Sequence, residues 1–249
     1  MKRQASQAKS DDANVPKAAP PIATNDELNA ILTQYQNAEF LAVDTEFLRE
    51  RTYYPQLCLI QISDGVDAVA IDPLAPNLDL NPLWDLMRNQ NITKVFHAGN
   101  QDMEIFLHLM GSLPEPIYDT QIAAMVCGLG DQVGYDKLIK AMLNHDIDKT
   151  SRFTDWSKRP LSNRQIVYAL DDVIYLAKLY PLMRSKLEAE NRSHWLDEEY
   201  AKSNDPATYV TAPDAAWQKL KVRNMRPAPL LRLMHLAAWR EREAQSRDL

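Results

Sequence analysis

The sequence predicts an α/β fold in which helices flank a mixed sheet, followed by a partial all-helical C-terminal domain. Three observations predict this class. Short apolar runs typical of strands alternate with longer stretches that have the periodicity of amphipathic helices. The pair Asp64-Gly65 separates two apolar runs, as expected for a β-hairpin. A polar stretch around Asp205-Pro206 separates this region from a new helical pattern that begins at Ala212.

The expected elements follow in chain order. A helix begins after Thr24, because Thr24 and Glu27 have the spacing of a capping box. The next elements are strands, expected from Phe40 to Glu46, over 57–63 and 66–72 on either side of the hairpin turn, and over 94–97. The small pair Ala98-Gly99 then leads into an amphipathic helix. A second capping box, formed by Ser162 and Gln165, begins a long helix without glycine.

These elements divide the chain into three parts. We expect a flexible tail at residues 1–22, a main domain at 23–205 and a helical unit at 206–249. From Lys219 onward, basic residues outnumber acidic ones, although the whole chain has a net charge of −6. This excess suits contact with nucleic acid, and it equally suits a solvated helix face.

Composition excludes several classes of protein. The 249 residues are 45% hydrophobic and 25% charged, which is typical of a soluble enzyme, and no apolar run is long enough for a membrane segment or a secretory signal. Cys58 and Cys127 lie in apolar surroundings and are predicted to be reduced, as in the cytoplasm. Six glycines form no phosphate-binding loop, so we expect no nucleotide cofactor, and the histidines and cysteines show no zinc-ligand spacing.

Four acids and one phenol lie on three of the predicted segments. Asp44 and Glu46 end a buried strand, and residues two apart on a strand point to the same side. Asp102 lies in the first turn of the helix that follows the strand at 94–97, which places it at the rim of the sheet. Tyr168 and Asp172 are four residues apart and share one face of the long helix.

Such a cluster predicts a metal site. Converging carboxylates repel one another, whereas Mg²⁺ and Mn²⁺ prefer carboxylate oxygens. Two divalent metal ions held by Asp44, Glu46, Asp102 and Asp172 would neutralise the cluster and serve a phosphodiester displacement. Taken one at a time, an acid at these positions is more often a turn former or helix cap. For this reason Asp119, which also suits an N-cap, is left out of the ligand set, and His97 is interpreted as a structural hydrogen-bonding residue.

Asp-x-Glu, a later Asp after His-Ala-Gly, and Tyr-x-x-x-Asp together resemble the three motifs of the DEDD 3′–5′ exonucleases of the tyrosine subclass. The longer segments DTEFLRERTYYPQLCLIQIS, HAGNQDMEIF and TDWSKRPLSNRQIVYALDDVIYL resemble bacterial ribonuclease D in the same order. Carried over by motif, the metal ligands fall on Asp44, Glu46, Asp102 and Asp172, and the catalytic, water-positioning tyrosine falls on Tyr168.

The resemblance implies a ribonuclease H-like exonuclease fold and a metal-dependent 3′–5′ exoribonuclease that releases nucleoside 5′-monophosphates. It implies RNA 3′ ends as partners, transfer RNA precursors above all. It also makes 23–205 the exonuclease domain and 206–249 the start of a helicase-and-RNase-D C-terminal domain, which we expect to be incomplete. Two alternatives stay open: a 3′–5′ DNA exonuclease with the same chemistry, and a non-catalytic RNA-binding module.

Substrate contacts are expected from basic, polar and aromatic residues near the motifs. A polyanion needs positive charge, and aromatic faces stack on any base. Tyr53 and Tyr54 are candidates for stacking, or else packing residues. The residues predicted to touch substrate are Arg49, Gln101, Arg152, Trp156 and Arg159.

Overall fold

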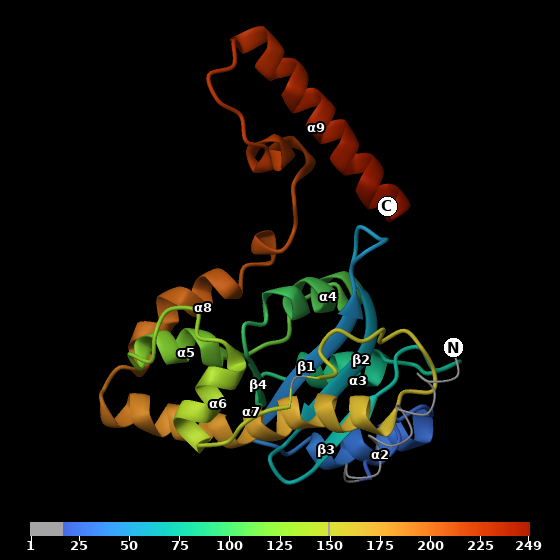
Figure 1. Ribbon diagram of the computed structural model, residues 1–249, viewed down its shortest axis with the longest axis vertical. Coiled ribbons are helices and arrows are strands. Elements are labelled where there is room, and N and C mark those ends of the chain that lie inside the picture. The colour runs from blue at the N-terminus through green and yellow to red at the C-terminus, as the bar shows by residue number, and fades with distance from the viewer. Residues whose placement is uncertain (1–16, 149) are drawn as a thin grey trace.

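A five-stranded mixed sheet forms the centre of the computed structural model, which describes residues 17–148 and 150–249 (Figure 1). The strands are β1 (Phe40–Leu48), β2 (Gln56–Ser63), β3 (Ala68–Ile71), β4 (Thr93–Phe96) and β5 (Ile117–Asp119). Their order across the sheet is β3-β2-β1-β4-β5. β1, β2 and β3 pair in antiparallel fashion, whereas β4 and β5 extend the sheet in parallel with β1. The mixed sheet predicted from the sequence is confirmed.

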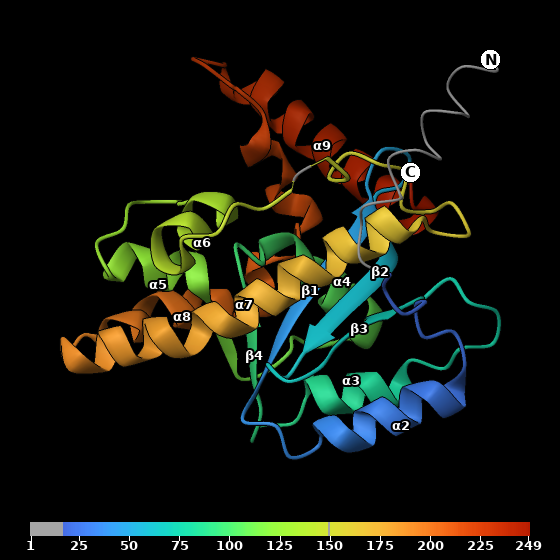
Figure 2. The same ribbon diagram turned by 60° about the horizontal axis from the view of Figure 1, so that its bottom comes forward.

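Helices cover both faces of this sheet (Figure 2). α2 (Asn25–Tyr35), α3 (Asn81–Met87) and α4 (Asn100–Met110) pack on one face, in a core that includes Leu41, Val43 and Phe96. α5 (Thr120–Val126), α6 (Tyr135–Leu143) and the long α7 (Asn163–Ala189) pack on the other face, against Ala42 and Val95. Successive residues of β1 therefore point into cores on opposite faces of the sheet. Because both faces are buried, this part of the strand is apolar without alternation.

The predicted helix starts are confirmed by their hydrogen bonds. The Thr24 hydroxyl oxygen accepts from the Glu27 N–H at the start of α2, and the Ser162 hydroxyl oxygen accepts from the Gln165 N–H at the start of α7. In α7 the Ser162 backbone N–H also donates to the Gln165 side-chain oxygen, which completes the capping box. The cap fixes where α7 begins, and so fixes the turn on which Tyr168 and Asp172 lie.

The hairpin turn is longer than predicted. β2 ends at Ser63 and β3 begins at Ala68, so four residues rather than Asp64-Gly65 alone make the connection. The Asp64 carboxylate accepts from the backbone N–H groups of Val66 and Asp67 and so closes a wider turn. Gly65 has φ +89°, which explains the glycine.

The predicted tail over 1–22 lies largely outside the described residues, which start at Lys17. Its last residue is tied to the sheet: the Ile22 N–H donates to the Ala70 carbonyl (2.8 Å), and the Ile22 carbonyl accepts from the Asp72 N–H (2.9 Å). Ala18 donates its N–H to the Asn163 side chain at the start of α7 (2.9 Å). The structured region therefore begins before residue 23.

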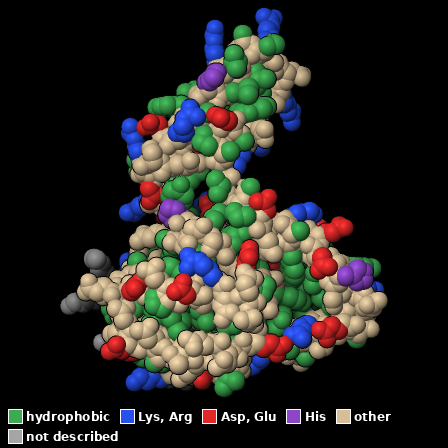
Figure 3. Space-filling view, turned by 180° about the vertical axis from the view of Figure 1, so that it is seen from behind, with side chains coloured by type: hydrophobic (Ala, Val, Ile, Leu, Met, Phe, Trp, Pro, Cys, Tyr) green, Lys and Arg blue, Asp and Glu red, His purple; other side chains and the backbone are tan. Residues whose placement is uncertain are grey.

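After α7 the chain is helical. The 3₁₀ turn Ser193–Leu196 and α8 (Asp197–Ser203) lead to two further 3₁₀ segments, Pro206–Thr208 and Pro213–Lys219, and to α9 (Pro227–Arg247). α9 lies beyond the end of the sheet, and its C-terminal end returns to the connection between β1 and β2 (Figure 1). Lys and Arg side chains project from this unit (Figure 3). Its assignment to a helicase-and-RNase-D C-terminal domain stays a prediction. Within the described part of the chain, no helix has the length and apolar character needed to cross a bilayer.

Candidate active site

The candidate site is built on the second half of β1. Asp44 pairs with Gln61 and Glu46 with Leu59, so the two acids lie two residues apart in a regular ladder and share one side of the sheet. Immediately after Glu46 the register slips: Phe47 pairs with Leu57, which makes a β-bulge. The bulge ends the regular pairing just beyond the second acid.

α7 supplies the third acid to the same place. It packs over the face of the sheet that carries Ala42 and Val95, and it begins at the Ser162 cap. Asp44, Glu46 and Asp172 each offer one carboxylate oxygen, and these atoms all lie within 4.8 Å of one another. Residues more than 120 positions apart in the sequence therefore meet at one point, as the motifs predict.

Asp102 comes from the first turn of α4 and is buried. The Thr45 hydroxyl, on the strand between the two acids, donates to Asp102 Oδ1 at 2.5 Å. Asp102 lines the same cavity but is not in the group of three whose oxygens lie within 4.8 Å. The structure thus joins the fourth acid to the cluster through Thr45, a residue that the sequence did not single out.

These residues line a single cavity of about 660 Å³, a volume within the range of small-molecule sites. Tyr168 lies in its wall with the four acids, and so do Arg152, Phe153 and Trp156 from the segment before α7. Five side chains predicted from three motifs are therefore brought to one cavity.

Burial raises the pKa of every acid in the cluster, and repulsion from other cluster acids adds to the shift for Asp44 and Glu46. The pKa of Asp44 is raised well above its ordinary value, first by burial and then by the charges of Asp172 and Asp102. Burial and the same two neighbours raise the pKa of Glu46 to about 9, while Arg152 opposes the shift. Burial raises the pKa of Asp102 and of Asp172 to about 7. The positive charge of Arg152 does not offset the burial and repulsion that disfavour the charged form of Glu46.

The donor set fits divalent cations of the hard kind. All the ligand atoms are carboxylate oxygens, which Mg²⁺ and Mn²⁺ prefer, and no histidine or cysteine joins the described group. Cations placed among the acids would favour their charged forms and remove the repulsion that raises their pKa values. The cluster therefore has the composition and the electrostatic need of a site for divalent metal.

Two residues that the sequence analysis left out of the ligand set are Asp119, which does not line the cavity, and His97, which does. Asp119 caps α5 by accepting from the Gln121 N–H (2.7 Å), and it also accepts from the N–H groups of Ala98 (3.0 Å) and Gly99 (2.9 Å). It fixes the turn that carries Asp102 rather than facing a metal. His97 places Nδ1 3.0 Å from the Thr120 hydroxyl, and burial lowers its pKa. A structural hydrogen bond for His97 agrees with the prediction.

Tyr135 is a cavity residue that the sequence analysis missed. It begins α6, its ring lies 5.2 Å from that of His97, and its hydroxyl donates to the backbone carbonyl of Asp172. This contact holds the turn of α7 that carries the third acid. No motif spacing pointed to Tyr135, because its role depends on the packing of α6 against α7.

The model of the 3′–5′ exonuclease family matches residues 20–188, which include every residue of the acidic cluster. The chain belongs to the 3′–5′ exonuclease family. The expected fold class is confirmed with it, since the matched residues contain the whole mixed sheet and nearly all of α7.

Among members of this 3′–5′ exonuclease family, the chain is 49% identical to ribonuclease D of Zymomonas mobilis, over 92% of this chain and 59% of that protein. The crystal structure of Escherichia coli RNase D, an exoribonuclease involved in structured RNA processing, is similar with a TM-score of 0.86 at 38% identity. That match covers 93% of this chain and 62% of the other. Brucella melitensis NrnC with bound Mg²⁺ has a TM-score of 0.64 at 27% identity, over 78% of this chain and 94% of NrnC. The resemblance to ribonuclease D is confirmed, and the chain spans about 60% of the length of the ribonuclease D relatives it matches.

The predicted substrate contacts occupy different positions in the structure. Arg49, Gln101, Arg152 and Trp156 all line the cavity. Arg49 is bound through both terminal nitrogens to Glu104 (2.5 and 2.7 Å), and Trp156 is buried. Tyr53 and Tyr54 do not line the cavity: Tyr53 donates to Glu241 of α9, and Tyr54 stacks on His108.

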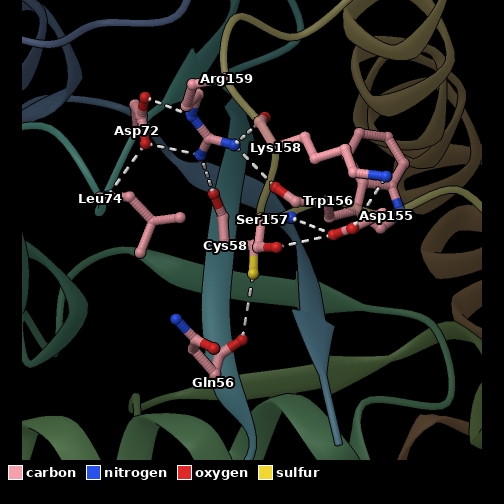
Figure 4. A network of polar contacts seen from close by, with 9 residues as sticks. All are labelled: Gln56, Cys58, Asp72, Leu74, Asp155, Trp156, Ser157, Lys158 and Arg159. Carbon is pink, nitrogen blue, oxygen red and sulfur yellow. Dashed lines mark hydrogen bonds and ion pairs between the residues drawn. The ribbon is translucent and has the colours of Figure 1, made fainter. Parts of the chain in front are cut away.

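Arg159 lies outside the cavity lining, in a network at the end of β3 (Figure 4). Its guanidinium donates to both Asp72 carboxylate oxygens (2.6 Å each) and to the Cys58 carbonyl (2.6 Å). The remaining bonds go to the carbonyls of Trp156 (2.7 Å) and Lys158 (2.9 Å). This arrangement does not support a substrate contact. We propose instead that Arg159 fixes the segment bearing Arg152 and Trp156 against β2 and β3.

Replacing Arg159 by alanine is expected to lower the free energy of unfolding by about 3 kcal/mol, because the largely buried Asp72 carboxylate loses its partner. Asp72→Ala added to Arg159→Ala should cost less than the sum of the two single losses, since both remove the same contact. Urea unfolding of the two single variants and the double variant measures this. Arg164→Ala, which breaks a more exposed pair with Asp148 (3.3 Å), is the control and should change stability by under about 1 kcal/mol. Additive losses would contradict the network.

Proposed function

We propose that the protein is a metal-dependent 3′–5′ exoribonuclease that hydrolyses the terminal phosphodiester of RNA and releases nucleoside 5′-monophosphates. The observation that carries this proposal is the meeting of Asp44, Glu46 and Asp172 within 4.8 Å, in a cavity that also holds Asp102 and Tyr168. Membership in the 3′–5′ exonuclease family supports the polarity. Similarity to Escherichia coli RNase D supports RNA as the substrate.

We assign the metal-ligand role to Asp44, Glu46, Asp102 and Asp172, and Mg²⁺ or Mn²⁺ as the ions, two in number. Bound divalent cations would lower the pKa of water and offset the charge of the phosphodiester. The similarity to NrnC with bound Mg²⁺ supports this choice of ion. Thr45 holds Asp102 in place from β1, so a displacement of either element is expected to disturb the ligand set.

Tyr168 is assigned the orientation of the attacking water. Burial raises its pKa further above the ordinary value for a phenol, and the charges of Asp172 and Glu46 add to that shift. The hydroxyl therefore keeps its proton at neutral pH and acts by hydrogen bonding, not as a general base. The ring centroid of Trp156 lies 6.1 Å from that of Tyr168, which packs against the buried cluster that contains Trp156.

The natural substrate is proposed to be structured RNA with a free 3′ end, and maturation of transfer RNA precursors is the specific role that we favour. Sequence-independent chemistry at the site suits this role, because cations and a phenol act on the phosphodiester and not on the base. Discrimination of RNA from DNA depends on recognition of the 2′-hydroxyl.

Two labelled substrates test the proposal. A 5′-labelled RNA incubated with Mg²⁺ should yield a ladder of products that shorten one nucleotide at a time, whereas a 3′-labelled RNA should release labelled mononucleotide from the start. A matched DNA oligonucleotide should be degraded more slowly. Endonucleolytic fragments, or RNA binding without any cleavage in Mg²⁺ or Mn²⁺, would contradict it. Equal rates on DNA would support the deoxyribonuclease alternative.

The assignment of metal ligands predicts that Asp172→Asn weakens the binding of Mn²⁺ at least tenfold and abolishes activity. Losing one carboxylate removes both a ligand and a charge from the cluster. Isothermal titration calorimetry with Mn²⁺ measures this directly. The matched control is Asp171→Asn, because Asp171 precedes Asp172 in α7 but is absent from the cluster and from the cavity lining. Equal losses in both variants would contradict the assignment.

The role of Tyr168 predicts a loss in kcat without a similar change in KM. Tyr168→Phe removes the hydroxyl alone, so turnover should fall about 100-fold while RNA affinity changes little. Single-turnover rates at saturating RNA measure this. Tyr175→Phe, which removes a hydroxyl two turns further along α7 and away from the cavity, should keep the original rate. An unchanged rate for Tyr168→Phe would exclude this role.

A further inference from the structure

The cavity wall contains a phenylalanine that is almost fully exposed. Phe153 is 91% accessible to solvent, although it lines the same cavity as the acids. Trp156, three residues later in the same segment, is 2% accessible. Removing a benzyl side chain from water lowers the free energy. An exposed ring at the edge of a cavity is therefore available to a flat apolar partner that enters.

The backbone around Phe153 is tied down on both sides. The Thr154 N–H (3.2 Å) and the Thr154 hydroxyl (2.9 Å) both donate to the Ser151 carbonyl and so close a turn. The Gln165 amide of α7 donates to the Thr154 hydroxyl oxygen at 3.1 Å. Ser151 and Trp156 are buried. Phe153 is therefore the outward-pointing residue of an anchored turn, and its exposure does not come from a lack of packing around it.

Arg152 brings a positive charge to this ring, in the same cavity as the acids. Its guanidinium carbon lies 5.4 Å from the Phe153 ring centroid, within the distance of a cation–π contact. The same charge opposes the rise in pKa of Glu46 and Asp172, which places it within electrostatic reach of the cluster. A cation in contact with a flat exposed ring, in the same cavity as the carboxylates, matches a nucleotide, whose phosphate is adjacent to its base.

We propose that Phe153 and Arg152 form a nucleotide subsite, in which the Phe153 ring stacks on a base of the last two nucleotides and Arg152 contacts the adjoining phosphate. The proposal rests on the proposed function, since it places the 3′ end of RNA in this cavity. Stacking is indifferent to the identity of the base, because every base has an aromatic face. The subsite would therefore hold any 3′ end in register with the acids without selecting a sequence.

The stacking proposal is tested by combining Phe153→Ala with RNA that lacks bases at its 3′ end. The combination separates the loss of stacking from other effects of the substitution. RNA affinity is measured by fluorescence anisotropy in an Asp44→Asn background, so that cleavage does not interfere. The protein with Phe153 and the Phe153→Ala variant are each compared on two oligonucleotides: one ordinary RNA, and one whose last two nucleotides lack bases. Phe153→Trp keeps an aromatic face, Phe153→Leu keeps an apolar side chain without one, and Val66→Ala removes an exposed apolar side chain from the β2–β3 turn.

We expect Phe153→Ala to weaken binding of the ordinary RNA about tenfold, and base removal to weaken binding by the Phe153 protein to the same degree. The two changes together should cost no more than either alone, because each removes the same stack. Phe153→Trp should bind as tightly as the parent, Phe153→Leu should resemble Phe153→Ala, and Val66→Ala should have no effect.

Three results would overturn the subsite. Equal affinity of Phe153→Ala and its parent for ordinary RNA would exclude stacking, as would additive losses in the combined experiment. Full affinity of Phe153→Leu would show that apolar bulk matters and the aromatic face does not. If the protein with Phe153 bound no RNA at all, the proposed function would fail first, and the measurement would show that separately.

Discussion

Electrostatic repulsion among buried carboxylates is the constraint on which the rest of the structure depends. Asp44, Glu46 and Asp172 bring oxygens within 4.8 Å of one another, and Asp102 is buried beside them. Burial raises the pKa of each, and the mutual repulsion adds to the shift for Asp44 and Glu46. A fold that holds these groups together without cations sacrifices stability at one point in exchange for a site that binds hard metal ions. The surrounding contacts have to be rigid enough to maintain that arrangement.

The four acids are accordingly fixed by several kinds of contact. The paired strands β1 and β2 hold Asp44 and Glu46, and Thr45 secures Asp102 from between them. Tyr135 holds the backbone of α7 at Asp172, and Asp119 fixes the turn before α4 through backbone amides. The segment before α7 is secured separately by Arg159. Elements from both faces of the sheet therefore converge on one cavity, which is the precondition for positioning a phosphodiester.

The sequence predicted the residues of the site better than it predicted the contacts that surround them. Asp44, Glu46, Asp102, Tyr168 and Asp172 were predicted because they form three motifs in order, each on a recognisable strand or helix, and the structure places all five in one cavity. Capping boxes at Thr24 and Ser162 were equally visible, since they depend on neighbouring residues. Tyr135, Thr45 and the Arg159–Asp72 pair join positions far apart in the chain. β5, with three residues, is too short to leave a periodic signal, and the hairpin turn was predicted too short because Asp64 reorganises it through its side chain.

The bulge after Glu46 divides β1 into a part that holds the two acids and a part that leads to Arg49. Up to Glu46 the ladder is regular, so side chains alternate strictly and the two acids cannot exchange faces. Past the bulge the chain follows a new register toward Arg49, whose side chain bridges to Glu104 on α4. The extra residue is Cys58 of β2, so the register at the two acids differs from the register beside the β1–β2 connection. A change of pairing near that connection therefore need not turn Asp44 or Glu46 to the other face.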